Sequence, residues 1–536
     1  MEQPSRTRRV ARIAAPIGLL LTVAAAVSPA AAAAPTTAIG PSTATAPYIL
    51  PVADGVKITS LLTVNDSKAA GNGYEMVGIP DGLGITKIDG KTVVYMTHEL
   101  RDAPGQAQGI VRRHGQIGAF VSRLTLDPKS LKVTSGSDLI DPGAQFWDYP
   151  NGTYVTSGAR WADMTTQQLS FGRFCSATLT DAGLLYNDDT GRGYKGQLFF
   201  GNEEDGDNGR AFAITEDGTA TSLPRLGLFS WENTVPAANR SDTTLVMGQE
   251  DGPGDGSQLW VYAGKKTKSG TPVDRAGLTN GLDYVFDAVN PAVTNDAQWR
   301  AAYPKGTAGQ VQLVNIPWSL TGALQNSIAK TDGLNLNRVE DGIWDPNRRN
   351  DFYFLTTEGG EKTGVGLDSR DGGGLWRLRF VDIERPERGA SLTLLLDGSE
   401  SLGGTEPKFN KPDNLGIDRH GNLLIQEDPG GNNHLARIIA YRIKDGAMGV
   451  VARFDEALFG AGANEDPNRL TIDEESSGII DAEKYLGDGT FVFDAQIHTA
   501  KNLPAGTGPG TVQEYVENGQ LLVLRVKGWD DVYDPD

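Results

Sequence analysis

The stretch Asp418-Arg-His-Gly-Asn-Leu-Leu-Ile-Gln426 carries the pattern that decides the fold. Its Gly-Asn pair supplies the positive φ that a hairpin turn needs, and a short run of strand-forming residues begins there. A second such run, Ala436–Ile443, follows after a loop. This stretch therefore predicts short antiparallel strands joined by tight turns.

The same pattern of short β-rich runs recurs along the chain. Further runs cover residues 92–96, 118–126, 196–200, 210–215, 243–247, 258–263, 351–356, 374–381, 391–396, 490–494 and 521–526. Many short strands without an alternating helical pattern favour a sandwich or a propeller over a parallel α/β sheet. Their number and length favour the propeller, so the sequence predicts an all-β fold, a β-propeller with helical and loop insertions.

Two segments interrupt this rhythm. Residues 267–330 contain helix-like stretches, notably 319–329, and we expect them to form an insertion or lid between blades. Residues 457–488 are acidic and rich in loop-forming residues. We expect a single propeller domain over residues 51–536, preceded by a disordered leader over residues 35–50, which are rich in Ala, Thr and Pro.

The first 34 residues have the three parts of a secretory signal peptide. Four arginines precede an apolar stretch over residues 13–27, and small residues at 30–34 suit a cleavage site. The apolar stretch is too short for a stop-transfer helix. The sequence therefore predicts a secreted, extracellular protein that is exported by the Sec or the twin-arginine route.

Charge and cysteine content restrict the possible partners. The formal net charge is −19 at pH 7, so the surface repels nucleic acid and anionic membranes, and we expect neither as a partner. Cys175 is the only cysteine, which excludes an intramolecular disulfide. Stability must therefore come from core burial or from cations that neutralise clustered acids. We expect a monomer.

Missing motifs restrict the chemistry. The chain has no G-x-S-x-G, H-E-x-x-H, Walker or C-x-x-C motif, and its five histidines show no pairing at helical spacing. A zinc hydrolase built on imidazoles is therefore disfavoured. Hard cations such as Ca²⁺ or Fe³⁺, held by carboxylates, fit better. Taken alone, Cys175 would more often be a small buried hydrophobe, and Glu203-Glu204-Asp205 a solvated turn.

A series of short motifs changes this balance because the motifs occur together and in order. They are Phe174-Cys175-Ser176-Ala177, Asn202-Glu203-Glu204, Trp231-Glu232-Asn233, Gln249-Glu250-Asp251, Arg338-Val339-Glu340-Asp341, Pro412-Asp413-Asn414-Leu415 and Glu475-Ser-Ser-Gly478. The series resembles the PhoX-type alkaline phosphatases, which are secreted six-bladed β-propellers with an iron–calcium cofactor. The resemblance runs from about Tyr95 to His498 and implies six blades here.

The resemblance also implies roles for individual residues. Cys175 matches the cysteine that ligates iron, and Arg338 matches the phosphate-binding arginine. The acidic residues that match metal ligands, or that lie close to the metals, are Glu203 or Glu204, Glu232, Glu340, Asp413 and Glu475. The implied function is a secreted, metal-dependent phosphoric-ester hydrolase that uses Ca²⁺ and Fe³⁺ on small-molecule phosphate esters.

Two other functions fit the same residues. One is a propeller hydrolase that uses calcium alone, either phytase-like or a lactonase or esterase. The other is a non-catalytic, calcium-stabilised secreted propeller in which the acids only join blades. The resemblance is also inexact, because the family string R-P-E-D stands here as Arg338-Val339-Glu340-Asp341 and an insertion over Leu184–Lys195 separates Cys175 from Glu203.

Overall fold

The computed structural model describes residues 1–2, 33–66, 70–103, 105–156, 169–254, 256–358, 372–398, 400–403, 406–430, 434–460 and 469–534. Residues 33–536 form one compact unit, which is separate from residues 1–32. The predicted signal peptide lies almost entirely outside the described residues. No helix in the described ranges is both long enough and apolar enough to cross a membrane.

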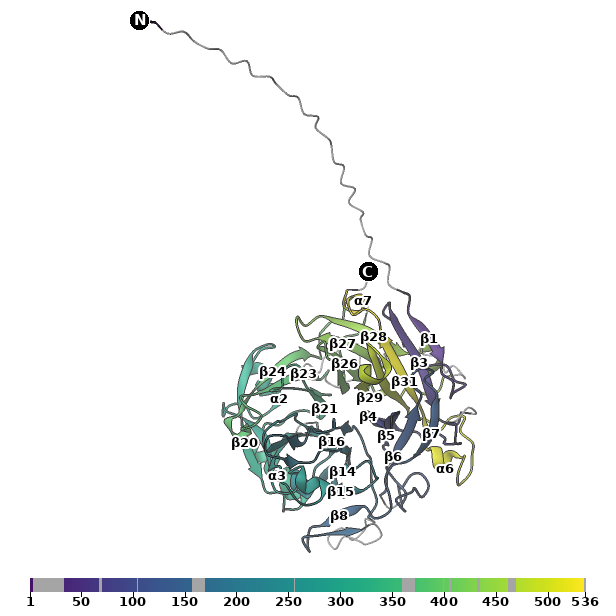
Figure 1. Ribbon diagram of the computed structural model, residues 1–536, viewed down its shortest axis with the longest axis horizontal. Coiled ribbons are helices and arrows are strands. Elements are labelled where there is room, and N and C mark those ends of the chain that lie inside the picture. Colours follow the sequence, from purple (N-terminus) through teal and green to yellow (C-terminus); the bar gives the residue numbers. More distant parts are fainter. Residues whose placement is uncertain are drawn as a thin grey trace. The chain divides into compact units, whose positions relative to one another are not determined.

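The larger unit is a six-bladed β-propeller built from antiparallel sheets (Figure 1). The first blade contains β4 (Pro80–Ile88), β5 (Lys91–His98), β6 (Phe120–Leu126) and β7 (Val133–Asp138). The second contains β10 (Thr178–Leu179), β13 (Phe199–Asn202), β14 (Ala211–Ile214) and β15 (Ala220–Ser222), with β8 (Gln145–Asp148) and β9 (Thr153–Thr156) at its outer edge. A small hairpin, β11 (Tyr186–Asn187) and β12 (Arg192–Gly193), interrupts the second blade. This hairpin is the predicted insertion over residues 184–195.

The third and fourth blades share one nine-stranded sheet. The third contains β16 (Trp231–Pro236), β17 (Thr243–Glu250), β18 (Leu259–Lys265) and β19 (Leu282–Ala288). The fourth contains β21 (Val339–Trp344), β22 (Asp351–Thr356), β23 (Gly374–Phe380) and β24 (Ala390–Asp397). Strand β20 (Ala308–Ile316) pairs with both β19 and β24 and so joins the two outer edges.

The N-terminal and C-terminal strands of this unit meet in the last two blades. The fifth blade contains β25 (Pro412–Ile417), β26 (Asn422–Glu427), β27 (Arg437–Arg442) and β28 (Met448–Phe454), with β2 (Ile49–Pro51) at its edge. The sixth contains β29 (Glu474–Asp481), β30 (Thr490–Ile497), β31 (Asn518–Val526) and the N-terminal strands β3 (Val56–Thr63) and β1 (Thr36–Ile39). Because β3 pairs antiparallel with β31, the beginning of the chain completes the blade that its end forms.

The predicted disordered leader is wrong for much of residues 35–50. Strand β1 pairs in parallel with β3, and β2 begins at Ile49. The Thr43 hydroxyl donates to Asp66, and the backbone N–H of Ala44 donates to the same carboxylate over 2.7 Å. The composition resembled a linker, but its threonines form strand and side-chain hydrogen bonds that hold the segment against the last blade.

Apolar side chains fill the spaces between neighbouring blades. Among the described residues they form six main clusters, and each cluster combines residues of two adjacent blades. Aromatic stacking contributes, since the Phe229 ring lies 4.0 Å from Trp231 and 4.4 Å from Trp260 between centroids. Full burial of one such side chain contributes about 1.5–3 kcal/mol. The closed circle of blade contacts therefore stabilises the unit and fixes its axis.

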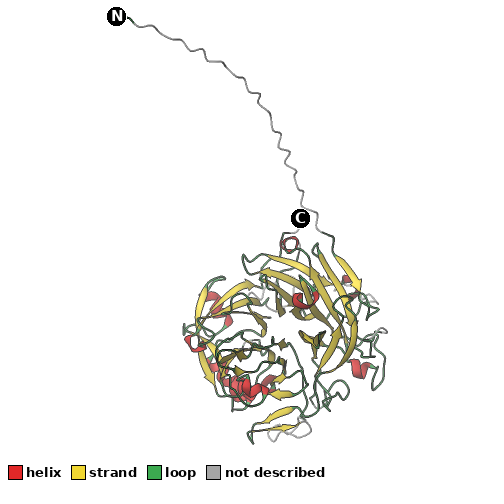
Figure 2. Ribbon diagram, viewed as in Figure 1, coloured by secondary structure: helices red, strands yellow, loops and turns green. Residues whose placement is uncertain are grey.

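The helices are short and lie outside the sheets (Figure 2). They are α1 (Pro272–Arg275), α2 (Asp296–Ala302), α3 (Gly322–Asp332), α4 (Glu456–Phe459), α5 (Glu483–Leu486), α6 (Val512–Tyr515) and α7 (Asp530–Tyr533), with 3-10 turns η1 (Gly206–Asn208), η2 (Pro224–Leu226) and η3 (Pro386–Arg388). The segment over residues 267–330 contains α1, α2 and most of α3, but it also contributes β19 and β20 to the shared sheet. It is therefore a helical elaboration of the third and fourth blades.

Candidate metal centre

The innermost strands carry one potential ligand from each blade. Figure 1 shows β4, β16, β21 and β29 nearest the centre of the unit, with β7, β8, β20 and β24 at its rim. Near the start of each inner strand stands one acid or thiol: Asp81, Cys175, Glu232, Glu340, Asp413 and Glu475. Because the inner strands of successive blades run in the same direction, these six side chains gather at one end of the axis. We call them the ligand ring.

A repeated backbone irregularity positions the ring. The strand ladder shifts register between residues 80 and 83 in β4, and likewise between 231 and 234, 339 and 342, 412 and 415, and 476 and 479. A bulge leaves residues out of the ladder and re-aims their side chains. In the second blade, Cys175 follows an isolated bridge between Phe174 and Glu203. In four blades the bulge therefore turns the ring residue out of the regular pleat, whereas Glu475 pairs with Gln496 just before the bulge of the sixth blade.

Four of the inner strands also share an unusual backbone conformation. Ile79, Arg173, Arg338 and Lys411 have φ of 50°, 44°, 55° and 48°, and each stands two residues before a ring residue. A left-handed conformation at a non-glycine residue costs roughly 1–3 kcal/mol and persists only where its surroundings enforce it. The strain recurs at equivalent positions, so it belongs to the way the propeller presents the ring.

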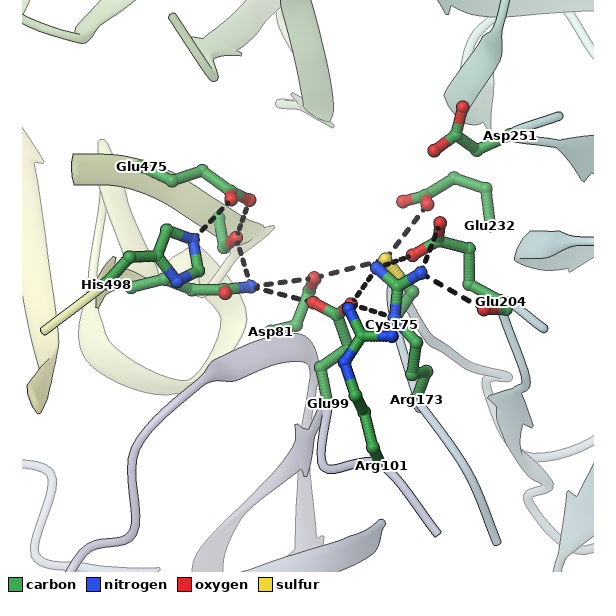
Figure 3. A network of polar contacts seen from close by, with 12 residues as sticks. Asp81, Glu99, Arg101, Arg173, Cys175, Glu204, Glu232, Asp251, Glu475 and His498 are labelled. Carbon is green, nitrogen blue, oxygen red and sulfur yellow. Dashed lines mark hydrogen bonds and ion pairs between the residues drawn. The ribbon is translucent and has the colours of Figure 1, made fainter. Parts of the chain in front are cut away.

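Five ring residues and Glu99, which directly follows β5, form two groups of three potential ligands. Asp81, Glu99 and Cys175 offer atoms within 4.8 Å of one another, and so do Glu232, Glu340 and Asp413. The thiol connects the groups, because Cys175 Sγ lies 2.9 Å from Glu232 Oε2 and 3.4 Å from Asp81 Oδ2 (Figure 3). One thiol and five carboxylates thus share a single buried centre.

The electrostatics of this centre suit cations. Burial, followed by the carboxylates of Asp251 and Asp341, raises the pKa of Glu232 to about 8. Burial also raises the pKa of the Cys175 thiol and of Asp413, and neighbouring acids add to both shifts. Oε1 of Glu232 and Oε1 of Glu340 are buried without a hydrogen-bond partner among the described residues. Clustered negative charge of this kind is tolerable when cations or protons neutralise it.

The donor atoms fit the two cations that the sequence predicts. Carboxylate oxygens are the preferred ligands of Ca²⁺, and a thiolate is a softer ligand that suits iron. The group that contains Cys175 therefore fits iron, whereas the all-carboxylate group of Glu232, Glu340 and Asp413 fits calcium.

Two arginines flank the ring. Arg338 donates from Nε and Nη2 to the two oxygens of Asp251, over 2.8 and 2.9 Å, and Nη2 lies 3.4 Å from Glu340. Arg173 stands at the equivalent position before Cys175 and donates to Glu99 over 2.8 Å and to Glu204 over 2.9 Å (Figure 3). Burial alone would raise the pKa of Glu99, but the Arg173 guanidinium holds it below its usual value.

Glu475 lies across the ring beside a histidine. His498 Nε2 is 3.4 Å from Glu475 Oε2, and Nδ1 is 2.9 Å from Glu517. Burial lowers the pKa of His498, but these two carboxylates outweigh it and raise the value to about 11. Gln496 connects the Glu475 side of the ring to the Asp81 side, because its amide donates to Ser477 over 3.0 Å and to Asp81 over 3.3 Å.

The structure separates the two neighbouring glutamates that the sequence offered as alternatives. Glu204 accepts from Arg173 beside the ring. Glu203 instead accepts from Arg210 Nη2 over 2.7 Å and from the backbone N–H of Gly172 over 3.0 Å, and it belongs to neither ligand group. Its carboxylate is therefore engaged in a buried ion pair, and the structure places Glu204, not Glu203, beside the ring.

Sequence reasoning missed Asp81, Glu99 and Arg173. A signal for Asp81 is present, because Pro80-Asp-Gly-Leu-Gly84 repeats the spacing of Pro412-Asp-Asn-Leu-Gly416. Both strings begin an inner strand and contain its bulge. Glu99 directly follows a strand end and has no comparable local pattern.

Comparisons with known proteins give a family match and two similar solved structures. Residues 213–478 match the family model described as "Alkaline phosphatase PhoX". The solved structure of Pseudomonas fluorescens PhoX in complex with vanadate, a transition state analogue, is 13% identical and has a TM-score of 0.55, with 92% of this chain and 99% of that chain covered. A luciferin-regenerating enzyme is 10% identical, with 84% and 94% covered and a TM-score of 0.32. No curated protein sequence matches significantly.

Proposed function

We propose that this chain, whose resemblance to the PhoX alkaline phosphatases is confirmed by the family match and by the shared propeller fold, is a secreted, metal-dependent phosphoric monoester hydrolase. The observation that carries the proposal is the ligand ring: five blades bring a thiol and carboxylates to two adjoining groups of potential ligands, and Glu475 of the sixth blade lies near them. A centre that only joined neighbouring blades would not need contributions from five blades.

The residues present would hold two kinds of cation. Cys175, Asp81 and Glu99 would hold iron, and Glu232, Glu340 and Asp413 would hold calcium, with Glu475 and Glu204 at the margins. Bound there, the ions would act as Lewis acids and lower the pKa of water. The protein contributes rigid placement, because the bulged strands fix each carboxylate before any ion arrives.

Arg338 would bind the phosphate group of the substrate. Asp251 engages its Nε and Nη2 atoms and so fixes the direction of the guanidinium. A phosphate would then be bound through the other edge of the guanidinium, which is formed by Nη1 and Nη2. The vanadate in the Pseudomonas PhoX structure, described there as a transition state analogue, supports phosphoryl transfer at a site of this fold. Such chemistry depends mainly on positioning and charge neutralisation.

Hydrolysis of p-nitrophenyl phosphate by the purified mature protein tests the proposal. Chelation should abolish the activity. Added calcium should restore the activity, provided that the chelator has left the iron in the protein. Iron together with calcium in the purified protein supports the proposal. Calcium without iron, combined with lactone or phytate hydrolysis, would favour the calcium-only hydrolase. No hydrolysis of any of these esters by the metal-loaded protein contradicts an enzymatic function.

A further inference from the structure

A groove lies next to the proposed phosphate-binding arginine, and none of its described lining residues belongs to the ligand ring. It has a volume of about 520 Å³ and is bounded by the loop after β17, by η1 and by one face of α3. Its lining includes Asp207, Ser230, Asp251, Asn326, Ser327 and Lys330. We call it the α3 groove.

Asp251 connects this groove to the ligand ring. Its carboxylate lines the groove and accepts both hydrogen bonds from Arg338. A phosphate bound at Arg338 would therefore lie close to the end of the groove, and the groove is placed to receive the alcohol portion of the ester.

The walls of the groove are held in place by their own contacts. Asn326 Nδ2 donates to Asp207 Oδ1 over 2.6 Å and ties α3 to η1. At the start of α3, a Cβ on Gly322 would meet the Asp207 carbonyl oxygen at 1.7 Å, so the helix packs directly on that turn. The opposite wall is tied by Ser257, whose hydroxyl accepts from the N–H of Gly252 over 3.2 Å. A pre-formed groove of this kind is typical of ligand sites.

The composition of the walls indicates the chemistry of the occupant. None of the described lining residues is aromatic, so the groove offers no platform on which a base or an aryl ring could stack. The lining includes three acidic residues, Asp207, Glu250 and Asp251, and one basic residue, Lys330. This balance repels a second phosphate. Amide, hydroxyl and carboxylate groups instead suit the hydroxyl groups of a neutral alcohol.

We infer that the α3 groove binds the alcohol portion of the substrate and selects monoesters of neutral, hydroxyl-rich alcohols such as sugar or polyol phosphates. The inference rests on the proposed phosphatase function. It assigns α3 and the loop after β17 to substrate selection, while the ligand ring retains the chemistry.

Substitutions on two neighbouring positions of α3 test the inference. Ser327 lines the groove, whereas Leu324 is exposed on the same helix and lies outside the groove. The kcat/KM of wild type, Ser327→Trp and Leu324→Trp should be compared on glucose 6-phosphate, phenyl phosphate and methyl phosphate. Methyl phosphate has no group that could occupy the groove, and so it reports on the ligand ring alone.

We expect Ser327→Trp to lower kcat/KM for glucose 6-phosphate at least about tenfold, in the range that loss of pocket contacts produces, and to leave methyl phosphate within about twofold. Leu324→Trp should alter neither. Ala323→Leu is a smaller change to the same wall, and it should lower kcat/KM for glucose 6-phosphate by a smaller factor. This variant provides the test if Ser327→Trp does not fold.

Each other outcome has a distinct meaning. An equal loss on methyl phosphate, or no loss on glucose 6-phosphate, overturns the groove as the alcohol site. A loss on phenyl phosphate as large as that on glucose 6-phosphate overturns the assignment to hydroxyl-rich alcohols. If the metal-loaded wild type hydrolyses none of the three esters, the proposed function itself fails.

Discussion

Glu203 and Glu232 are both buried glutamates, but one forms a buried ion pair and the other is a potential metal ligand. Glu203 lies between the Arg210 guanidinium and the N–H of Gly172, whereas Glu232 lies beside the thiol of Cys175 and has one oxygen without a hydrogen-bond partner. Sequence motifs predicted both as ligands. Neighbouring residues of a strand point to opposite sides, and a short motif does not reveal which of Glu203 and Glu204 faces the axis.

Matched amide substitutions at these two positions should separate metal binding from stability. Glu232→Gln should lower bound metal and activity by about 10–100-fold while the protein stays folded, because a ligand and its charge are lost. Glu203→Gln should keep bound metal but lower the free energy of unfolding by up to about 3–5 kcal/mol, because the buried Arg210 loses its counter-charge. Metal analysis and urea denaturation measure the two effects. The reverse pattern would contradict the assignment.

Arg338 should act on substrate and not on metal. Arg338→Ala should weaken phosphate binding by about 1.5–3 kcal/mol, the usual worth of a charged hydrogen bond, and so raise KM or the inhibition constant of phosphate about 10–100-fold. Arg338→Lys should recover part of this loss, since it keeps the charge and loses the planar fork. Inhibition by inorganic phosphate, measured alongside metal content, checks the prediction. Unchanged phosphate inhibition in Arg338→Ala would remove this arginine from the phosphate site.

At the scale of strands, the sequence predicted the outer parts of each blade and missed most of the inner strands. Runs such as 351–356 and 521–526 appear as β22 and β31 with nearly the predicted bounds. Strands β4, β16, β21, β25 and β29 escaped because acids, glycines and prolines at their bulges break the apolar pattern. The acids that interrupt the apolar pattern of these strands belong to the ligand ring. Residues needed for the site therefore weakened the sequence pattern by which the strands could have been predicted.

Gly82 in β4 tests the link between strand packing and the ring. A Cβ on Gly82 would lie 2.2 Å from the backbone nitrogen of Ala177, so Gly82→Ala must push the first and second blades apart beside Asp81 and Cys175. We expect a loss of about 1–3 kcal/mol in stability together with reduced metal content.

Gly90→Ala is the matched control at the far end of the same hairpin. Gly90 has φ of 77° and open space around its Cβ position, so the substitution strains the turn by about 1 kcal/mol and should leave metal content unchanged. Thermal unfolding and metal analysis of both variants provide the comparison. Full metal content in Gly82→Ala would show that the ring tolerates displacement of these strands.

At the scale of the molecule, the buried acids make the metal-free protein sensitive to pH. Burial raises the pKa of Glu232 to about 8, and it also raises the pKa of Asp81, Glu340 and Asp413. These groups bind protons more tightly in the folded than in the unfolded state. The folded state therefore holds more protons above the usual carboxylate pKa, and stability falls as the pH rises through this range.

We expect the chelated protein to have a lower Tm at pH 8 than at pH 6. The free energy of unfolding should fall by about 1.4 kcal/mol per pH unit for each group that remains protonated only in the folded state. Glu99, whose pKa is held low by Arg173, is deprotonated in both the folded and the unfolded state between pH 6 and 8, so it does not change this slope. Added calcium and iron should raise the Tm most at pH 8, because cations replace the protons. Thermal unfolding at both pH values, with and without metals, measures this. A chelated protein that is more stable at pH 8 would contradict the account.

The propeller itself could be predicted from the recurring strands and turn pairs, and its closure could not. The pairing of β3 with β31 joins residues more than 400 positions apart, and no local pattern specifies such a contact. Four of the ordered motifs, those with Cys175, Glu232, Glu340 and Asp413, pointed to the ligand ring because each stands at the same place in its blade. The α3 groove depends on how α3 packs against η1, which only the folded chain reveals.

The location of bound ions tests the central claim most directly. Crystals of the purified mature protein, measured by anomalous diffraction on both sides of the iron absorption edge, would show iron and distinguish it from calcium. We predict an iron peak within bonding distance of Cys175 Sγ and calcium beside Glu232, Glu340 and Asp413. An active enzyme whose ring residues bind no ion would contradict the account.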